Sequence, residues 1–359
     1  MLALLIALAV TASAGPTLAQ DTAPADSSGQ SQPLVAILPF ANYTGDPDAA
    51  DIFEPALHGA LGRRRLTYLT ASSLRPLLRQ HRIRSRGWIS RRGAEIIAAE
   101  TGVRYLLLGS WDVLRRDGNV EVGFSLRVLE TASMALVGGA SAGGTGEDSV
   151  GWLDLGRVED VSVLADTLLV RAVADLAPFP PPAEVLRSWR GCNHLAVIPF
   201  DNFSETRHAG GIATNILLSR LLAEGYFVVE PGFVRELGIA RETVVKGGVD
   251  RASARAIEEA LGACRVVTGA VDVFEPARGD PSVSIPRLSV GFRVTSSASG
   301  NLYMIRNLEA AGDDKQTVFH FGRVNSLVAL ADRLFGTFAQ ELKEVNREDI
   351  LNDPGRNSE

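Results

Sequence analysis

The chain has 359 residues, of which 46% are apolar and 22% are charged, and its formal net charge is -6. This composition is that of ordinary globular protein, and the length leaves room for two domains of usual size. The acidic balance argues against a general nucleic-acid-binding protein, because such proteins need basic charge to neutralise phosphate.

The N-terminal segment has the layout of an export signal. Residues 1–19 carry no charge, and an apolar run at residues 1–10 is followed by small residues. We therefore predict a cleaved secretory signal peptide at residues 1–19. No transmembrane span is expected, because Gly15 and Pro16 interrupt the run before it reaches about 20 apolar residues. Residues 20–33 have almost no apolar side chain and should form a disordered leader. These features predict a soluble, exported protein.

One stretch of the chain occurs twice. The sequence V-A-I-L-P-F-A-N-Y-T at residues 35–44 returns as L-A-V-I-P-F-D-N-F-S at residues 195–204, displaced by 160 residues. The offset holds without a gap as far as Asp112 and Asp272, so we interpret the chain as a tandem duplication. The resulting division is a first domain at residues 34–176, a proline-rich linker at 177–192, a second domain at 193–343 and a disordered tail at 344–359.

Each copy begins with alternating strands and helices. In the first copy an apolar run at residues 35–38 predicts a buried strand. Apolar residues at helical spacing over residues 52–61 predict a helix, and residues 66–69 predict a second strand. A further helix should begin at the N-cap Ser90 and end at Gly102, where a left-handed residue stops it. The second copy repeats all of these features, with Asp250 as the N-cap and Gly262 at the helix end.

The later part of each copy changes to a period of two. Residues 105–108 predict a strand covered on both faces, and the alternation over residues 121–128 predicts antiparallel strands with one open face. Asp112 and its counterpart Asp272 are expected on that open face. The glycine-rich segment 138–146 lacks the lysine of a phosphate-binding loop and is expected to be a flexible connection.

A strongly apolar helix closes each copy, at residues 161–176 and 327–342. The predicted fold class is therefore α/β. It consists of two tandem β-α-β-α-β-β-β-α units, each a mixed sheet packed with helices.

Arginine is concentrated between residues 63 and 104, where eleven arginines stand against two glutamates. Such asymmetry can mark a docking face for an anionic partner, and Trp88 adds an aromatic side chain of the kind enriched at interfaces. The alternative is a solvated face without a partner. The candidate partner-binding residues are Arg79, Arg82, Arg84, Arg86, Trp88, Arg91 and Arg92.

Cys192 and Cys264 are the only cysteines, and each precedes a predicted strand of the second copy. If those strands are neighbours, the sulfurs could form a disulfide, which an oxidising compartment favours. Two separate reduced thiols are the alternative. No catalytic residue, metal site or cofactor is expected, and a hydrolase that uses Asp112 or Asp272 is the remaining enzymatic alternative.

The motif V-A-I-L-P-F-x-N-x-T, followed by a helix and then by T-G-V-R-Y-L-L-L-G-S, resembles the TolB amino-terminal-domain-like superfamily. That superfamily includes CsgG-, LpoB- and FlgO-like bacterial envelope proteins. The resemblance covers residues 35–176 and, less closely, residues 195–342. It implies a noncatalytic periplasmic protein of the cell envelope whose partner is an envelope protein complex or another anionic partner. The alternative is an accessory subunit of an export or surface-appendage assembly system that forms a homo-oligomer. Neither a cofactor nor nucleic acid is expected.

Overall fold

The computed structural model describes residues 34–116, 118–148, 157–176, 192–242, 248–277, 284–314 and 323–352. We call residues 34–176 the first half and residues 192–352 the second half. The predicted signal peptide and leader lie outside the described residues, as do residues 177–191 of the predicted linker. In the described part of the chain, no helix has both the length and the apolar character of a membrane span.

Strands form at the segments of the first half that the sequence predicted, residues 35–38, 66–69, 105–108 and 121–128, and also at two further segments. These strands are β1 (Val35–Ile37), β2 (Ala41–Asn42), β3 (Tyr68–Leu69), β4 (Tyr105–Arg115), β5 (Glu121–Glu130) and β6 (Ala135–Thr145). β1 lies between β3 and β4 and is parallel to both, whereas β4, β5 and β6 follow one another as antiparallel neighbours. The sheet is therefore mixed.

The strands of the second half repeat this order. They are β7 (His194–Val197), β8 (Asp201–Asn202), β9 (Phe227–Val229), β10 (Arg265–Glu275), β11 (Arg287–Ser296) and β12 (Leu302–Ala311). β7 lies between β9 and β10 and is parallel to both, and β10, β11 and β12 are antiparallel neighbours. Both long strands carry a β-bulge at the same place, at Asp112 in β4 and at Asp272 in β10.

The helices include two that the sequence analysis missed. The helices are α1 (Ala49–Arg63), α2 (Ala71–Gln80), α3 (Arg91–Thr101), α4 (Val161–Leu176), α5 (Ala209–Ala223), α6 (Pro231–Ala240), α7 (Arg251–Leu261) and α8 (Leu327–Asn352). α2 and α6 were not predicted. Each has only 10 residues, and α2 buries only Leu74 and Leu78, so its apolar pattern is weak.

The predicted helix ends at α3 and α7 are confirmed. Ser90 Oγ accepts a hydrogen bond from the Gly93 amide (3.1 Å), and Asp250 Oδ1 accepts one from the Ser253 amide (2.8 Å). Both helices stop at a left-handed residue, with φ 68° at Gly102 and φ 70° at Gly262. The N-cap side chains fix the helix starts because they satisfy amides that a helix start leaves unpaired. The glycines fix the helix ends because they adopt the left-handed conformation without a steric cost.

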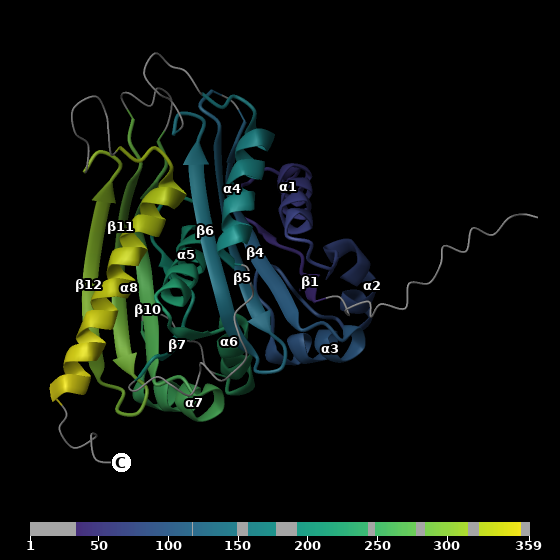
Figure 1. The fold of residues 1–359 in the computed structure, drawn as a ribbon. Coiled ribbons are helices and arrows are strands. Elements are labelled where there is room, and N and C mark those ends of the chain that lie inside the picture. Colours follow the sequence, from purple (N-terminus) through teal and green to yellow (C-terminus); the bar gives the residue numbers. More distant parts are fainter. Residues whose placement is uncertain are drawn as a thin grey trace, which may run out of the picture. The chain divides into compact units, whose positions relative to one another are not determined.

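One sheet runs through both halves. Its strand order is β12-β11-β10-β7-β9-β6-β5-β4-β1-β3, and the halves join where β6 pairs with β9 in antiparallel fashion, at Leu136 and Val228. Residues 32–359 accordingly form one compact unit. In Figure 1, α5 lies between β10 of the second half and β6 of the first.

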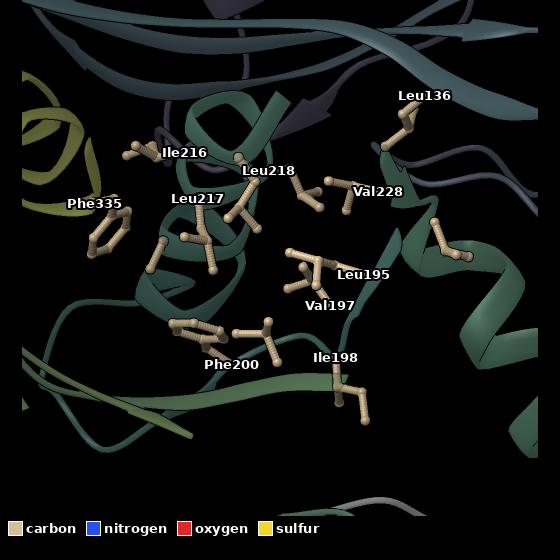
Figure 2. Close-up of a cluster of buried hydrophobic side chains, with 14 of the residues drawn as sticks. Leu136, Leu195, Val197, Ile198, Phe200, Ile216, Leu217, Leu218, Val228 and Phe335 are labelled. Carbon is tan, nitrogen blue, oxygen red and sulfur yellow. The ribbon is translucent and has the colours of Figure 1, made fainter. Parts of the chain in front are cut away.

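Helix α5 is covered on both sides, and this explains its composition. It packs on β9, β10 and α8 of its own half and on β4, β5 and β6 of the first half. Its side chains from Ile212 to Ser219 are all buried. Figure 2 shows this cluster, in which Leu136 of β6 joins Leu217 and Leu218 of α5 and Phe335 of α8. A helix that is apolar nearly all round is expected in such a position.

The glycine-rich segment 138–146 corrects one prediction. It is not a flexible connection, since most of it belongs to strand β6. A Cβ at Gly139 would lie 2.8 Å from Ser219 Cα, and one at Gly143 would lie 2.6 Å from Val328 Cβ. The small residues therefore let α5 and α8 approach the strand closely. The glycines of this segment provide room for the helices and not flexibility of the backbone.

The predicted tail begins too early. Helix α8 continues to Asn352, so residues 344–352 are helical, and only residues 353–359 lie outside the described residues. Asn346 Nδ2 donates a hydrogen bond to Tyr226 Oη (2.8 Å), which holds this part of the helix against the second half. The polar composition of residues 344–352 indicated disorder because this contact is not visible in the local sequence.

Candidate functional site

The candidate arginine surface lies at a groove between the two halves. The groove has a volume of about 530 Å³, and its first wall comes from the segment between α2 and α3 and from α3 itself. Its second wall is α6, which contributes Arg235, Glu236 and Ile239. Of the seven predicted residues, the groove is lined by Arg82, Arg84, Trp88 and Arg92, whereas Arg79, Arg86 and Arg91 lie outside the lining.

The groove combines positive charge with an apolar floor. Arg82, Arg84 and Arg92 are exposed, and Arg235 adds a fourth guanidinium from the opposite wall. The floor contains Ile83, Ile89 and Ile96, and Ile239 at the rim is 68% exposed. The acidic side chain among the lining residues, Glu236, accepts a hydrogen bond from the Arg91 amide (2.7 Å). The groove thus presents surplus positive charge beside apolar surface.

Trp88 has a structural contact that the sequence analysis did not foresee. Its side chain is half-buried, and Nε1 donates a hydrogen bond to Oδ1 of Asn215 in α5 (3.0 Å). Asn215 belongs to the second half, so Trp88 joins the two halves as well as lining the groove. This double use arises because the residues after α2 pass directly beside α5.

A buried polar network lies behind Trp88. Arg127 of β5 has no exposed surface. Its Nη1 donates to Asn215 Oδ1 (2.8 Å), its Nη2 to the Gly87 carbonyl (2.5 Å) and its Nε to Glu230 Oε2 (3.4 Å). Glu230 also accepts from the Ile89 amide (3.4 Å). Burial raises the pKa of Glu230, and the charge of Arg127 opposes that rise. The network connects both halves through a compensated buried charge.

Asp112 continues the network and corrects a prediction. It is not on an open face: it is 2% exposed, because α5 covers this part of the first-half sheet. Ser110 Oγ donates to its Oδ1 (2.5 Å) and Ser125 Oγ to its Oδ2 (2.7 Å), while Asn215 Nδ2 donates to Ser110 Oγ (2.8 Å). A carboxylate enclosed in this way is a poor candidate for hydrolysis. Its counterpart Asp272 is exposed.

The environment of Asp112 predicts a pH-dependent stability. Burial raises the pKa of Asp112 from 3.8 to about 7, against hydrogen bonds from Ser110 and Ser125 and the charge of Arg127. The pKa of Asp112 in the folded protein lies above its value in the unfolded chain. The contribution of Asp112 to the free energy of unfolding is therefore complete below pH 3.8 and is lost as the pH rises to about 7. Asp112→Asn resembles the protonated form. Between the low and high ends of that pH range, the free energy of unfolding of this variant should rise relative to that of the wild type by on the order of 4 kcal/mol, from about 1.4 kcal/mol per pKa unit.

Urea denaturation at pH values across this window measures the effect. Glu121 and Asp148 also have pKa values raised by burial, so the difference between variant and wild type, rather than the slope of either, isolates Asp112. Asp272→Asn is the matched control, because the same bulge position is exposed there. Parallel pH profiles for Asp112→Asn and wild type would contradict the interpretation.

The two cysteines are joined. A disulfide connects Cys192 and Cys264, whose Cα atoms are 5.8 Å apart across a sequence separation of 72. The sulfurs meet because Cys192 lies two residues before β7 and Cys264 one residue before β10, and these strands pair in parallel with Leu195 opposite Arg265. Among the described residues, no group of histidine, cysteine, aspartate and glutamate side chains is arranged to hold a metal ion.

The residues of the buried network were missed by sequence reasoning, although each left a signal. Arg127 is a polar member of the alternation of β5, Asn215 lies in an otherwise apolar helix, and Glu230 follows a buried strand. Each reads locally as a solvent-facing residue. Their partners lie 40 to 141 positions away in sequence, so no local pattern could have brought them together.

No family model and no curated protein matches this chain. Among solved structures, the chain is similar to the PelC dodecamer from Paraburkholderia phytofirmans, with 19% identity, a TM-score of 0.26 and coverage of 42% of this chain and 91% of that one. It is also similar to lipoprotein GNA1162 from Neisseria meningitidis, with 15% identity, a TM-score of 0.29 and coverage of 44% and 98%. The C-terminal domain of LpoB from Escherichia coli is similar with 18% identity and a TM-score of 0.24, and the match covers 34% of this chain and 85% of that one. The TM-scores are low, so no assignment of function follows from these likenesses.

Proposed function

We propose that this chain is a noncatalytic periplasmic component of the bacterial cell envelope that binds another envelope protein. In this proposal it carries two tandem copies of a TolB amino-terminal-domain-like module. Support for the duplication comes from the matching strand order and from corresponding registers, since Val35 pairs with Tyr105 and Leu195 pairs with Arg265. The Cys192–Cys264 disulfide supports an oxidising compartment, because such bonds persist outside the reducing cytoplasm.

The groove is the observation that carries the binding role. Its exposed guanidinium groups can pair with carboxylates, and its isoleucine-rich floor can bury apolar side chains of the same ligand. A free phosphate or a simple headgroup would use the charge but not the floor. The arrangement therefore favours a protein segment that carries both acidic and apolar residues.

Site-specific photocrosslinking in living cells tests this role. A photoreactive side chain placed at Ile239, at the groove rim, should form a defined crosslink to one envelope protein. The triple reversal Arg82→Glu, Arg84→Glu and Arg92→Glu should reduce that crosslink at least tenfold, because three favourable charge contacts become repulsive.

A second reversal with the same change in net charge serves as the control. Arg64, Arg255 and Arg333 are exposed and lie outside the groove lining, so their replacement by glutamate should leave the crosslink intact. Equal losses in both triple variants would show that net charge, and not the groove, governs binding. A crosslink that survives the groove reversal would reject the groove as the binding site.

A second candidate function is an oligomerising accessory subunit of an export or surface-appendage assembly system. The observation that favours it is an uncovered face of the sheet in the second half, which does not involve the arginine groove.

A further inference from the structure

The sheet has an uncovered face in the second half. There, strands β10, β11 and β12 border a hollow of about 300 Å³ whose lining includes Phe203, Asp272, Arg293, Ile305 and Asn307. In the first half, the face formed by β4, β5 and β6 is instead covered by α5 and α8. The two faces are built from corresponding strands, but among the described residues only the first-half face is covered by helices of the other half.

Strand register identifies the corresponding positions. Arg127 pairs with Leu108 in β4 and with Gly139 in β6, and Arg293 pairs with Thr268 in β10 and with Ile305 in β12. Arg293 therefore corresponds to Arg127, and Ile305 corresponds to Gly139. By the same reasoning Leu302 corresponds to Leu136 and Asn307 to Ser141.

Exposed apolar side chains gather at these positions. The large apolar residues exposed in the described part of the chain are Val163, Phe203, Ile239, Leu302 and Ile305. Three of the five, Phe203 (72% exposed), Leu302 (55%) and Ile305 (45%), belong to the uncovered face or its edge. Burial of such residues is favourable, and their concentration on one face marks an interaction surface.

Their first-half counterparts all touch the second half. The ring of Tyr43, the counterpart of Phe203, stacks on His208 with centroids 5.2 Å apart. Leu136 pairs with Val228 across the strand junction, and a Cβ at Gly139 would lie within 2.9 Å of both Ser219 Cα and Leu222 Cδ1. The uncovered face thus repeats the positions of an interface that the chain already makes with itself.

We infer that this face binds a second copy of the chain, head to tail. The incoming copy presents α1, α4 and β3, which correspond to α5, α8 and β9. Its β3 pairs with β12, since these strands form the two ends of the sheet order. The first half of one molecule thereby packs against the second half of the next. This contact repeats the one that the second half makes with the first half within one chain.

The two surfaces complement each other in size. At the internal interface the strand is small and the helix large, with Gly139 against Ser219 and Leu222. At the proposed interface the strand is large, with Ile305, and the helix positions that correspond to Ser219 and Leu222 are the exposed Gly59 and Gly62. On α4, exposed Val163 corresponds to Ala329, whose amide lies beside Gly143. At α1 the incoming surface therefore supplies space where the receiving strand supplies bulk, whereas on α4 Val163 is larger than its counterpart Ala329.

At two positions the halves differ in a way that makes the contact between molecules less close than the internal contact. Glu309 stands where the first half has Gly143, and Ser72 stands where the second half has Gly232, whose Cβ position lies 1.8 Å from the Ile89 carbonyl oxygen. Each adds a side chain at a point of close approach. The association should therefore be reversible and dependent on concentration, and because the joined surfaces differ, it produces rings or filaments rather than a symmetric dimer.

Sedimentation velocity with single variants tests the proposal. The purified wild type should show an average mass that rises with concentration. Ile305→Glu damages the receiving face and Val163→Glu the incoming face, so each variant alone should remain a monomer. Both positions are exposed, so neither change disturbs the interior of the fold. Ile239→Glu, at a more exposed isoleucine outside both surfaces, should associate like the wild type.

An equimolar mixture of the two damaged variants is the decisive measurement. The intact receiving face of Val163→Glu can bind the intact incoming face of Ile305→Glu, and the outer surfaces of that pair are both blocked. The mixture should therefore form a dimer and nothing larger. A wild type that stays monomeric, variants that associate like the wild type, or a mixture that stays monomeric would each overturn the proposal. None of these results depends on the arginine groove, so the proposed binding function is tested separately.

Discussion

Replacing Arg127 with methionine should lower the free energy of unfolding by about 3–5 kcal/mol, the range found when one partner of a buried ion pair is removed. The substitution leaves the Glu230 carboxylate buried without its guanidinium and the Gly87 carbonyl without its side-chain donor, and it removes one of the two donors of Asn215 Oδ1, the other being Trp88 Nε1. The buried groups then lose both charge compensation and hydrogen bonds. Urea denaturation followed by tryptophan fluorescence measures the loss, since Trp88 contacts the same network.

A double variant separates the ion pair from simple loss of packing. Glu230→Gln combined with Arg127→Met removes the uncompensated charge, so it should recover part of the stability lost in Arg127→Met alone. Arg293→Met is the matched control, because Arg293 occupies the corresponding strand position and is exposed. We expect it to change stability by no more than about 0.5 kcal/mol. Similar losses for Arg127→Met and Arg293→Met would exclude a stabilising role for the network.

Removal of the Cys192–Cys264 disulfide should lower the free energy of unfolding by roughly 4 kcal/mol, from the chain entropy of a loop of this length. The sequence separation is 72, and the closed loop contains β7, β8, α5, β9, α6 and α7. Because α5 belongs to this loop, the loss affects both halves. Denaturation of Cys192→Ser/Cys264→Ser beside wild type gives the value directly.

Reduction provides the control for that variant. A phosphine reductant should shift the unfolding of the wild type toward that of Cys192→Ser/Cys264→Ser and leave the variant unchanged. If reductant and substitution both have no effect on unfolding, the bond does not restrict the unfolded chain as the loop length requires.

Features with a local cause were predicted well from the sequence. The positions of strands β1, β3, β4 and β5 along the chain follow from apolar runs or from alternation, and the ends of α3 and α7 follow from Ser90, Asp250 and two glycines. These signals act within a few residues, so they can be recognised without the rest of the fold. The long apolar helices α4 and α8 belong to the same group, except for the last part of α8.

Features that depend on contact between the halves were not predictable in this way. Arg127 and Ser125 alternate with apolar residues as if they faced solvent, yet α5 covers them. Asp112 was assigned to an open face for the same reason. Only one wall of the groove could be predicted from the sequence. The arginines of the first wall stand out in the composition, whereas Arg235 and Ile239 come from a helix about 150 positions later.

The position of α5 between two sheet surfaces also makes the folding of the first half depend on the second half. Strand β5 is complete at Glu130, but the carboxylate that compensates Arg127 belongs to Glu230, and the helix that covers Asp112 begins at Ala209. A nascent chain that ends before these residues carries an exposed β6 edge and an uncompensated guanidinium, so its first half cannot reach its final packing. Such partly folded chains are prone to aggregate. The second half must therefore be present before the packing of the first half can be completed.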